Sequence, residues 1–383
     1  MKARTPVIDS LSSNGITFTN YWVNPECSPT RAAMLTGRYG FRTGVGSVAG
    51  NSPPNLNQNE TIIQKYINSR TFNTYSTALV GKWHLSGKNE LSEPENFGIQ
   101  YFSGFLPGAV EDYYHWTCTG GGYQQTISTY TTTYFVDLSV QWMKRQTQPF
   151  FLWLAFNAPH SPFQRPPQKL ITDEELSRYR QHTETDQKAY YLSSIEAMDK
   201  EIGRLIASMS KQQKDNTVFV FMGDNGTPGR IAQKPFTTNT SKSSLFQGGI
   251  NTPLIVSGQG ITRKNTVETA MVQATDIFAT LADISGIQKI DDQDGKSIKP
   301  LFNSEKGAKR SFVYSEIFGS ARAENNGYAI RNKNYKLIHL DKGKEYLFRI
   351  SSDPFETSNL LDHTLNGEEN DNLIALRLIK SKL

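Results

Sequence analysis

Short apolar runs alternate with longer helix-like stretches through most of this 383-residue chain, and this alternation is the strongest constraint on its fold. The runs with the length and composition of strands are residues 16–23, 78–80, 150–156, 218–222 and 253–256. The stretches with helical character are residues 61–69, 134–145, 185–209 and 275–284. Strands that alternate with helices are typical of α/β proteins, so we predict a mostly parallel central sheet with helices on both faces.

The pattern changes after Gly286. Short strand-like pieces follow one another with turn residues between them, at 312–315, 328–331, 335–340 and 346–349, and a helix-like stretch covers 372–382. Strands joined by short turns are expected to pair in an antiparallel sheet. We therefore predict two parts: an α/β domain over residues 1–286 that carries the chemistry, and a small antiparallel α+β subdomain over residues 287–383.

Charge, hydropathy and cysteine content argue against a nucleic-acid-binding protein, a membrane-spanning protein and a disulfide-rich protein. The net charge of +5 is mild for this length, and no basic run alternates with aromatics, so nucleic acid is not a predicted partner. No run approaches the roughly 18 apolar residues of a membrane span, so no membrane-spanning segment is predicted. The two cysteines, Cys27 and Cys118, cannot form a disulfide framework, although a single bridge between them stays open at this point.

Polar clusters follow three of the apolar runs directly. They are Gly81-Lys82-Trp83-His84, Asn157-Ala158-Pro159-His160 and Gly223-Asp224-Asn225-Gly226. In open α/β sheets, the loops after the carboxyl ends of the strands collect the catalytic and binding residues. These three clusters are therefore predicted to form the rim of an active site.

The segment Cys27-Ser28-Pro29-Thr30-Arg31 has the character of a helix start, and 31–35 can continue the helix. Cys27 would then lie at the positive end of a helix, which favours a bound anion or a thiol of low pKa. The alternative is a buried structural cysteine in front of an ordinary helix. The local sequence favours neither interpretation over the other.

The longer motif Cys-x-Pro-Thr-Arg followed by Leu35-Thr36-Gly37-Arg38 resembles the signature of type I, formylglycine-dependent sulfatases of the alkaline phosphatase-like superfamily. Further segments that are similar to the family occur in the family's order: 5–11, 15–20, 81–85, 158–160, 223–226, 294–297 and 353–356. The resemblance implies the family's fold. It also implies that a separate formylglycine-generating enzyme oxidises Cys27 to Cα-formylglycine, whose hydrate supplies the nucleophile, and that Ca²⁺ is the metal.

The resemblance also implies roles for single residues. Arg31 stabilises the formylglycine, His84 orients its hydroxyl, and His160 protonates the leaving oxygen; Lys82 and Lys242 bind the sulfate, and Asp224 and Asn225 bind Ca²⁺. Each has a plainer alternative without the family match: a tight turn for Asp-Asn-Gly, and solvated or half-buried side chains for the lysines and histidines. Since Lys82 and His84 lie two residues apart, their side chains are expected to share one face of an extended segment.

One departure from the family concerns the metal. The family begins with a buried strand that ends in paired aspartates, and no Asp-Asp pair precedes Cys27 here, since Asp9 falls on a helix position and Asp291-Asp292 lies near the subdomain. The N-terminal metal-binding strand is therefore expected to be missing. Because Ca²⁺ takes six to eight oxygen ligands, its binding is expected to be weak or absent.

The function expected from the resemblance is a sulfuric ester hydrolase that acts on a sulfated carbohydrate or related ester, in the periplasm or secreted. Two alternatives remain open: a non-catalytic, sulfatase-like binder of sulfated glycans, and a phosphoester or phosphonate hydrolase of the same superfamily. His115 and Trp116 are candidates for a sugar subsite, and an aromatic loop that packs on itself is the alternative.

Overall fold

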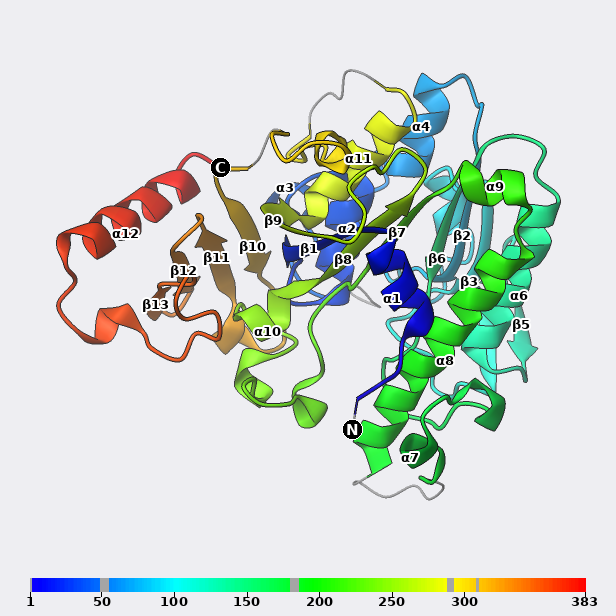
Figure 1. The fold of residues 1–383 in the computed structure, drawn as a ribbon, viewed down its shortest axis with the longest axis horizontal. Helices are drawn as coiled ribbons and strands as arrows, with labels where there is room; N and C mark the ends of the chain where they lie inside the picture. Colours follow the sequence, from blue (N-terminus) through cyan, green and yellow to red (C-terminus); the bar gives the residue numbers. More distant parts are fainter. Residues whose placement is uncertain (1, 49–54, 180–185, 288–292, 308–309) are drawn as a thin grey trace.

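Three β-sheets form the framework of the computed structural model, which describes residues 2–48, 55–179, 186–287, 293–307 and 310–383 (Figure 1). Asp291 and Asp292 lie outside the described residues. The first sheet has the order β5-β4-β3-β2-β6. Its strands are β2 (Ser76–Lys82), β3 (Tyr101–Phe105), β4 (Trp116–Gly120), β5 (Tyr123–Ile127) and β6 (Phe150–Ala155). β2 runs parallel to β3 and β6, whereas β4 pairs antiparallel with β3 and β5.

The second sheet has the order β7-β8-β1-β9. Its strands are β1 (Gly15–Trp22), β7 (Val218–Met222), β8 (Asn251–Gly258) and β9 (Thr266–Gln273). β1 is parallel to β9 and antiparallel to β8, and β8 is antiparallel to β7. The predicted α/β class is therefore confirmed, and the pairings show that both sheets are mixed rather than mostly parallel.

Helices cover both faces of the five-stranded sheet. The described helices are α1 (Pro6–Ser13), α2 (Cys27–Thr36), α3 (Gly40–Thr43), α4 (Ile63–Arg70), α5 (Glu93–Asn96), α6 (Thr131–Lys144), α7 (Glu174–Ser177), α8 (Asp186–Ser208), α9 (Lys211–Asp215), α10 (Gln247–Ile250), α11 (Ala274–Ile284) and α12 (Gly367–Lys380). Leu79 of β2 packs with α2, α4 and α11, and the next residue, Val80, packs with α6 and α8. Adjacent strand residues point to opposite faces, so the apolar centre of β2 at Leu79 and Val80 is buried on both sides of the sheet.

β6 and β7 pack on a common cluster of buried side chains. Each strand is terminal in its sheet among the described residues. Their apolar side chains are mostly only partly buried, and Trp153 of β6 packs into the same cluster as Val218, Val220 and Met222 of β7. Among the described residues the two sheets therefore share this cluster, and β6 and β7 form no hydrogen-bonded pair with each other.

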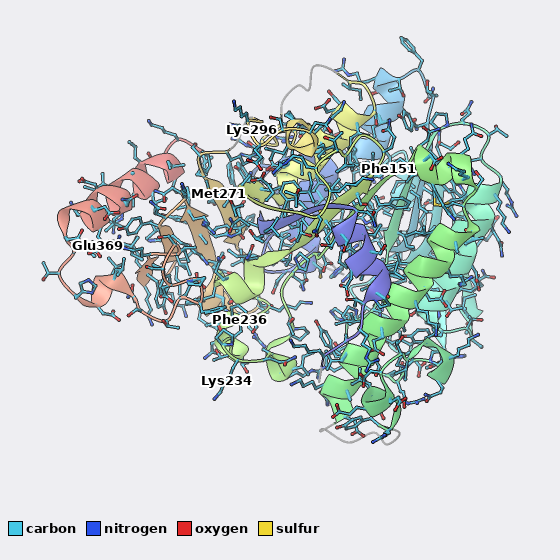
Figure 2. All side chains as sticks on the ribbon, in the orientation of Figure 1. Phe151, Lys234, Phe236, Met271, Lys296 and Glu369 are labelled. Atoms are coloured by element: carbon cyan, nitrogen blue, oxygen red, sulfur yellow. The ribbon has the colours of Figure 1, made fainter. Side chains whose placement is uncertain are left out.

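The C-terminal sheet is antiparallel, as predicted, and has the order β10-β11-β12-β13. Its strands are β10 (Val313–Ile317), β11 (Gly327–Arg331), β12 (Lys336–Leu340) and β13 (Glu345–Phe348). Figure 2 shows Glu369 of α12 at one end of the molecule and Phe151 of β6 in the part that holds the five-stranded sheet. Trp22 and Ile250 pack against this sheet, and Ser315 Oγ donates to the carbonyl of Val23 at 2.8 Å. The C-terminal sheet thus reaches the strand that leads into α2.

The apolar runs and helix-like stretches of the sequence predict, to within a few residues, most of the elements that frame the candidate site. These are strands β1, β2, β6, β7 and β8 and helices α4, α6, α8 and α11. Strands β3, β4, β5 and β9 were not predicted from the sequence. In the described part of the chain, no helix combines the length and apolar character needed to cross a bilayer.

Candidate active site

Cys27 is the first residue of α2, and its side chain is 2% exposed. The chain enters the helix from an extended Glu26 and leaves it at Gly37, whose φ of 70° is the left-handed conformation that glycine adopts readily. Every residue of α2 is buried. The four-residue spacing places Arg31 one turn beyond Cys27 on the same face. The predicted helix start is confirmed, and the thiol lies at the helix end that favours negative charge.

His84 contacts the thiol directly, with Nδ1 3.1 Å from Cys27 Sγ. Ser28 Oγ donates to the carbonyl of His84 at 2.9 Å, so the start of α2 also fixes the backbone of this histidine. His84 has a φ of 58°, which corrects the expectation that Lys82 and His84 lie in one extended segment. Lys82 ends β2, and the left-handed turn then brings the imidazole back toward Cys27.

Gly108 leaves the space that the His84 ring occupies. A Cβ atom at this position would lie 2.5 Å from Cε1 and 2.7 Å from Nε2 of His84. The backbone N–H of His84 donates to the carbonyl of Leu106 at 3.0 Å, so the loop around Gly108 holds both the backbone and the ring. Gly108 therefore positions His84 against Cys27, a role for which the sequence analysis gave no signal.

Cations dominate the electrostatics around the thiol. Burial raises the pKa of Cys27, but Lys82 and His84 outweigh burial, and the pKa lies well below its ordinary value. Burial lowers the pKa of Lys82 and of His84, while the neighbouring thiolate raises both. The site is therefore suited to a negative charge at residue 27. Both cysteines are free, so the bridge between Cys27 and Cys118 does not form.

Arg31 connects three parts of the site. Its Nη1 donates to the carbonyl of Lys82 at 2.9 Å, and its Nε and Nη2 donate to Oδ2 of Asp224 at 3.2 and 2.8 Å. The guanidinium carbon lies 6.0 Å from the ring centroid of Trp153 on β6. Arg31 is itself 5% exposed, so its charge is compensated inside the protein by Asp224.

Asp224 and Asn225 follow β7 and supply two oxygen donors of the kind that Ca²⁺ prefers. Burial raises the pKa of Asp224, but Arg31 and Lys82 lower it well below its ordinary range, so the carboxylate is charged. Oδ1 of Asn225 is buried without a hydrogen-bond partner, whereas Nδ2 donates to the carbonyl of Gly226. A buried, unpartnered amide oxygen fits a metal ligand.

The metal set is nevertheless incomplete in the described residues. They contain no group of three or more His, Cys, Asp or Glu side chains that would hold a metal ion. Asp224 also shares Oδ2 with Arg31. The described chain therefore fits a hard divalent cation in part, with two oxygen ligands where about six to eight are usual for Ca²⁺.

His160 lies on the loop after β6, and the loop is anchored by backbone contacts. Tyr113 Oη donates to the carbonyl of His160 at 2.7 Å, and the N–H of His160 donates to the carbonyl of Asn157 at 2.9 Å. Nδ1 lies 2.8 Å from the carbonyl of Ser161, so Nδ1 carries a proton and Nε2 is free to exchange one. Burial, together with Lys242 and Lys82, lowers the pKa of His160 to about 4.

Lys242 lies on the loop between β7 and α10. Its N–H donates to the carbonyl of Thr227 at 3.0 Å, and the next residue, Ser243, donates from N to the carbonyl of Pro25 at 2.9 Å. The charge of Lys242 lowers the pKa values of Cys27, Asp224 and His160. Lys242 therefore belongs to the same electrostatic cluster, and the structure gathers the eight residues singled out in the sequence: Cys27, Arg31, Lys82, His84, His160, Asp224, Asn225 and Lys242.

Glu26 was not indicated by the sequence. It is 7% exposed, precedes Cys27, and accepts from the N–H of Val48 at 3.1 Å. Burial raises its pKa. Of the aromatic candidates, Trp116 is 4% exposed and packs edge-on against Tyr134 and Phe135, while His115 is exposed. Trp116 is therefore a core residue and not a sugar platform.

With this geometry in place, comparison with protein families gives a clear result. A model of the sulfatase family matches residues 1–287. The chain belongs to the sulfatase family. A second model, for the C-terminal region of N-sulphoglucosamine sulphohydrolase, matches residues 240–380. The chain is thus a type I sulfatase of the alkaline phosphatase-like superfamily by sequence, and the signature around Cys27 lies inside the first match.

Individual sulfatases agree with this assignment. The chain is 27% identical to arylsulfatase J of Mus musculus over 304 residues, which is 74% of this chain and 48% of that protein. It is 28% identical to the uncharacterized sulfatase YdeN of Escherichia coli (strain K12) over 337 residues, 79% of this chain and 57% of that one. The chain thus spans about half the length of these curated relatives. The crystal structure of Ps i-CgsB in complex with k-i-k-neocarrahexaose shares the fold, with a TM-score of 0.83, 24% identity, and coverage of 100% of this chain and 87% of that chain.

Proposed function

We propose that this chain is a sulfuric ester hydrolase that removes sulfate from a sulfated carbohydrate or related ester, with residue 27 as the nucleophile. One observation carries the proposal: Cys27 Sγ lies at the start of α2, 3.1 Å from His84 and within the field of Lys82 and Lys242. A helix N-terminus surrounded by cations is suited to a tetrahedral oxyanion such as a sulfate group.

The nucleophile is proposed to come from Cα-formylglycine, made from Cys27 by a formylglycine-generating enzyme. The hydrated aldehyde would supply a hydroxyl that attacks sulfur and a second hydroxyl that allows the sulfated enzyme to release its product. Sulfatases are generally formylglycine- and Ca²⁺-dependent, and in this chain Asp224 and Asn225 would hold the cation. Arg31, one turn after residue 27 on α2, pairs with Asp224 and keeps that carboxylate charged.

The remaining residues divide the work of binding and proton transfer. Lys82 and Lys242 neutralise the sulfate oxygens, and His84 orients the attacking group through Nδ1. His160 protonates the leaving oxygen through Nε2, since Nδ1 is held by Ser161. A bound sulfate offsets the repulsion that Lys242 and Lys82 exert on the imidazolium, so substrate binding raises the pKa of His160 and loads it with a proton.

A carbohydrate substrate is supported by the match of residues 240–380 to a sulphohydrolase named for a sulfated amino sugar. It is supported also by the shared fold of a protein solved with a neocarrahexaose. We further propose that the chain works in the periplasm or is secreted, and that residues 1–286 and 287–383 are its catalytic domain and C-terminal subdomain.

The test is aryl sulfate turnover by the full chain co-produced with a formylglycine-generating enzyme. The Cys27→Ala variant is the control, and mass spectrometry of the residue-27 peptide measures conversion. We expect turnover that tracks the converted fraction. Converted protein that is no faster than Cys27→Ala would disprove the hydrolase assignment, and faster turnover of aryl phosphate than of aryl sulfate would favour a phosphoester or phosphonate hydrolase.

A non-catalytic binder of sulfated glycans is the second candidate. It is favoured by the two oxygen ligands at Asp224 and Asn225, where a catalytic Ca²⁺ usually has more. The lysine cluster would retain a sulfated sugar without cleaving it. Unmodified Cys27 in protein from the native producer, together with saturable binding of a sulfated sugar, would support this candidate.

A further inference from the structure

The loops after β6 and β7 contact each other outside the group of proposed catalytic residues. The loop after β6 carries His160 and, three residues later, Phe163; the loop after β7 carries Asp224 and Asn225 and, further along, Arg230. The guanidinium carbon of Arg230 lies 4.5 Å from the centroid of the Phe163 ring, which is within cation–π range. Arg230 therefore links the loop of the proposed acid to the loop of the proposed metal ligands.

This contact belongs to a continuous wall that leads to the sulfate-binding lysine. The Phe163 ring meets Tyr191 of α8 edge-on, with centroids 5.8 Å apart. Tyr191 Oη lies 3.3 Å from Oγ1 of Thr227, and the carbonyl of Thr227 accepts from the N–H of Lys242. A substrate whose sulfate is held by Lys242 therefore has this wall beside it.

Arg230 has unused hydrogen-bonding capacity. It is exposed and packs on the Phe163 ring, and within the described residues its guanidinium forms no hydrogen bond or ion pair with another side chain. By contrast, Arg165, on the loop after β6, donates to the carbonyls of Tyr179 and Ser177. A guanidinium that packs on a ring uses no N–H group in that contact, so its planar fork stays available to the two oxygens of a carboxylate or sulfate.

The sequence adds a second cation to the same loop. Lys234 lies four residues after Arg230, and Figure 2 shows it on the loop at the outer edge of the molecule. The segment between β7 and α10 thus carries Arg230 and Lys234 as well as Lys242. A ligand with a single sulfate would use the inner part of this surface alone.

We propose that Arg230, held over the ring of Phe163, is a specificity-determining subsite for a second anionic group, a carboxylate or a second sulfate, on the sugar next to the one that is desulfated. This inference rests on the proposed function and narrows its substrate class to polyanionic glycans. Phe163 is a positioning residue, because it acts through Arg230.

The experiment compares probes with one and two anionic groups. The single-anion probes are an aryl sulfate and glucosamine 6-O-sulfate. The two-anion probes are disaccharides of glucosamine 6-O-sulfate whose neighbouring sugar carries either a carboxylate or a sulfate ester. The carboxyl-reduced disaccharide keeps the 6-O-sulfate but has an uncharged neighbouring sugar, so it is the reference for both, and comparison of the two charged disaccharides identifies which anion the subsite accepts.

Arg230→Gln should lower kcat/KM for a two-anion disaccharide roughly tenfold, through KM, and leave both single-anion probes unchanged. Arg230→Lys should recover part of the loss, because it restores the charge without the planar fork. Arg70→Gln is the matched control: Arg70 also stacks on an aromatic ring, 5.4 Å from the Tyr66 centroid, but on α4. Equal effects of Arg230→Gln on all probes, or no effect on any, would overturn the proposal.

Binding separates this inference from the proposed function. Calorimetric titration of the Cys27→Ala protein measures affinity for the same probes without turnover. If no probe is hydrolysed by converted protein but the two-anion disaccharide still loses roughly tenfold affinity in Cys27→Ala/Arg230→Gln, the hydrolase proposal fails and the subsite stands. If the affinities are equal with and without Arg230, the subsite is wrong whatever the turnover.

Discussion

Arg31 donates to Oδ2 of Asp224 from both Nε and Nη2, at 3.2 and 2.8 Å. The pair joins the helix that begins at Cys27 to the loop after β7, and its carboxylate is also one of two proposed metal ligands. Both halves of the candidate site therefore depend on one side chain. This relationship gives the first of five predictions.

Replacement of Arg31 by Gln should abolish measurable aryl sulfate turnover and lower the free energy of unfolding by about 2 kcal/mol at pH 7, because Asp224 loses its charged partner. Arg31 lowers the pKa of Asp224 in the folded state, so its contribution is present above the unfolded carboxylate pKa of about 4 and is lost as the pH falls below it. Urea unfolding at pH 7 and pH 3 measures the difference.

Arg263→Gln is the control for Arg31→Gln, since Arg263 pairs with the buried Glu268 at 2.9 Å on the far edge of the second sheet. It should lose stability and keep turnover. A stability loss for Arg31→Gln that is the same at both pH values would contradict the role assigned to Asp224.

The pH dependence of turnover should follow His160. Its pKa of about 4 in the free protein means that the protonated form, which is the proposed acid, is lost as the pH rises above that value. We expect log(kcat/KM) to fall with unit slope above about pH 4, while kcat stays level to higher pH because bound sulfate raises the pKa. His160→Gln should remove this dependence along with most of the rate. A kcat/KM that rises between pH 5 and pH 7 would rule out His160 as the acid.

Unconverted Cys27 should be a thiolate at neutral pH. Lys82 and His84 lower its pKa well below the ordinary value, whereas burial raises the pKa of Cys118, which gives an internal comparison. Thiolate absorbance near 240 nm in a Cys118→Ser background should titrate well below the ordinary cysteine pKa of about 8.5. Lys82→Met should move the titration upward. An unchanged midpoint in Lys82→Met would show that the lysine does not act on residue 27.

Gly108→Ala should displace the His84 ring, because the new Cβ would lie 2.5 Å from Cε1 of a side chain that is 5% exposed. We expect at least a tenfold fall in kcat and a rise in the Cys27 thiol pKa, since the contact at Nδ1 is lost. Gly87→Ala is the matched control, because its nearest neighbour to a new Cβ is 3.4 Å away. If the Cys27 thiol of Gly108→Ala titrates as it does in the unsubstituted protein, the loop has shifted and the His84 ring has stayed in place.

Calcium affinity is the fifth prediction. With Asp224, Asn225 and residue 27 as the protein ligands, binding to this 383-residue chain should be no tighter than about 10⁻⁴ M. At or below that concentration Ca²⁺ should add less than about 0.4 kcal/mol of stability. Calorimetric titration decides, with Asn225→Ala as the comparison. Submicromolar binding with one ion per chain would show that further carboxylates complete the site.

Much of the site could be predicted because its signals are local. A cysteine before Ser-Pro, and polar residues directly after apolar runs, mark α2 and the ends of β2, β6 and β7 without knowledge of the fold. The resemblance then assigned roles to eight residues that the structure gathers around Cys27. Those roles remain predictions until the experiments above are done.

The rest depends on contacts between segments that are far apart in the chain. Strand order depends on pairing between strands that are far apart in the sequence, so the mixed parallel and antiparallel order of both sheets could not be predicted from local sequence. The left-handed backbone of His84 is set by Ser28 and by the loop at Gly108, and the stacking of Arg230 on Phe163 joins two loops. Sequence spacing gives no measure of such distances.

A buried ion pair in the C-terminal region limits how the two parts of the chain can change during evolution. Glu356 is buried, pairs with Lys336 of β12, and accepts from the N–H of Gln247, which begins α10 just after the loop of Lys242. Lys336 in turn lies 5.0 Å from the ring centroid of Trp22, close to the start of α2. The C-terminal region is therefore not an interchangeable module. A chimera that takes this region from a distant relative will need matching residues at Trp22 and around Gln247, so the two parts of the chain are constrained to diverge together.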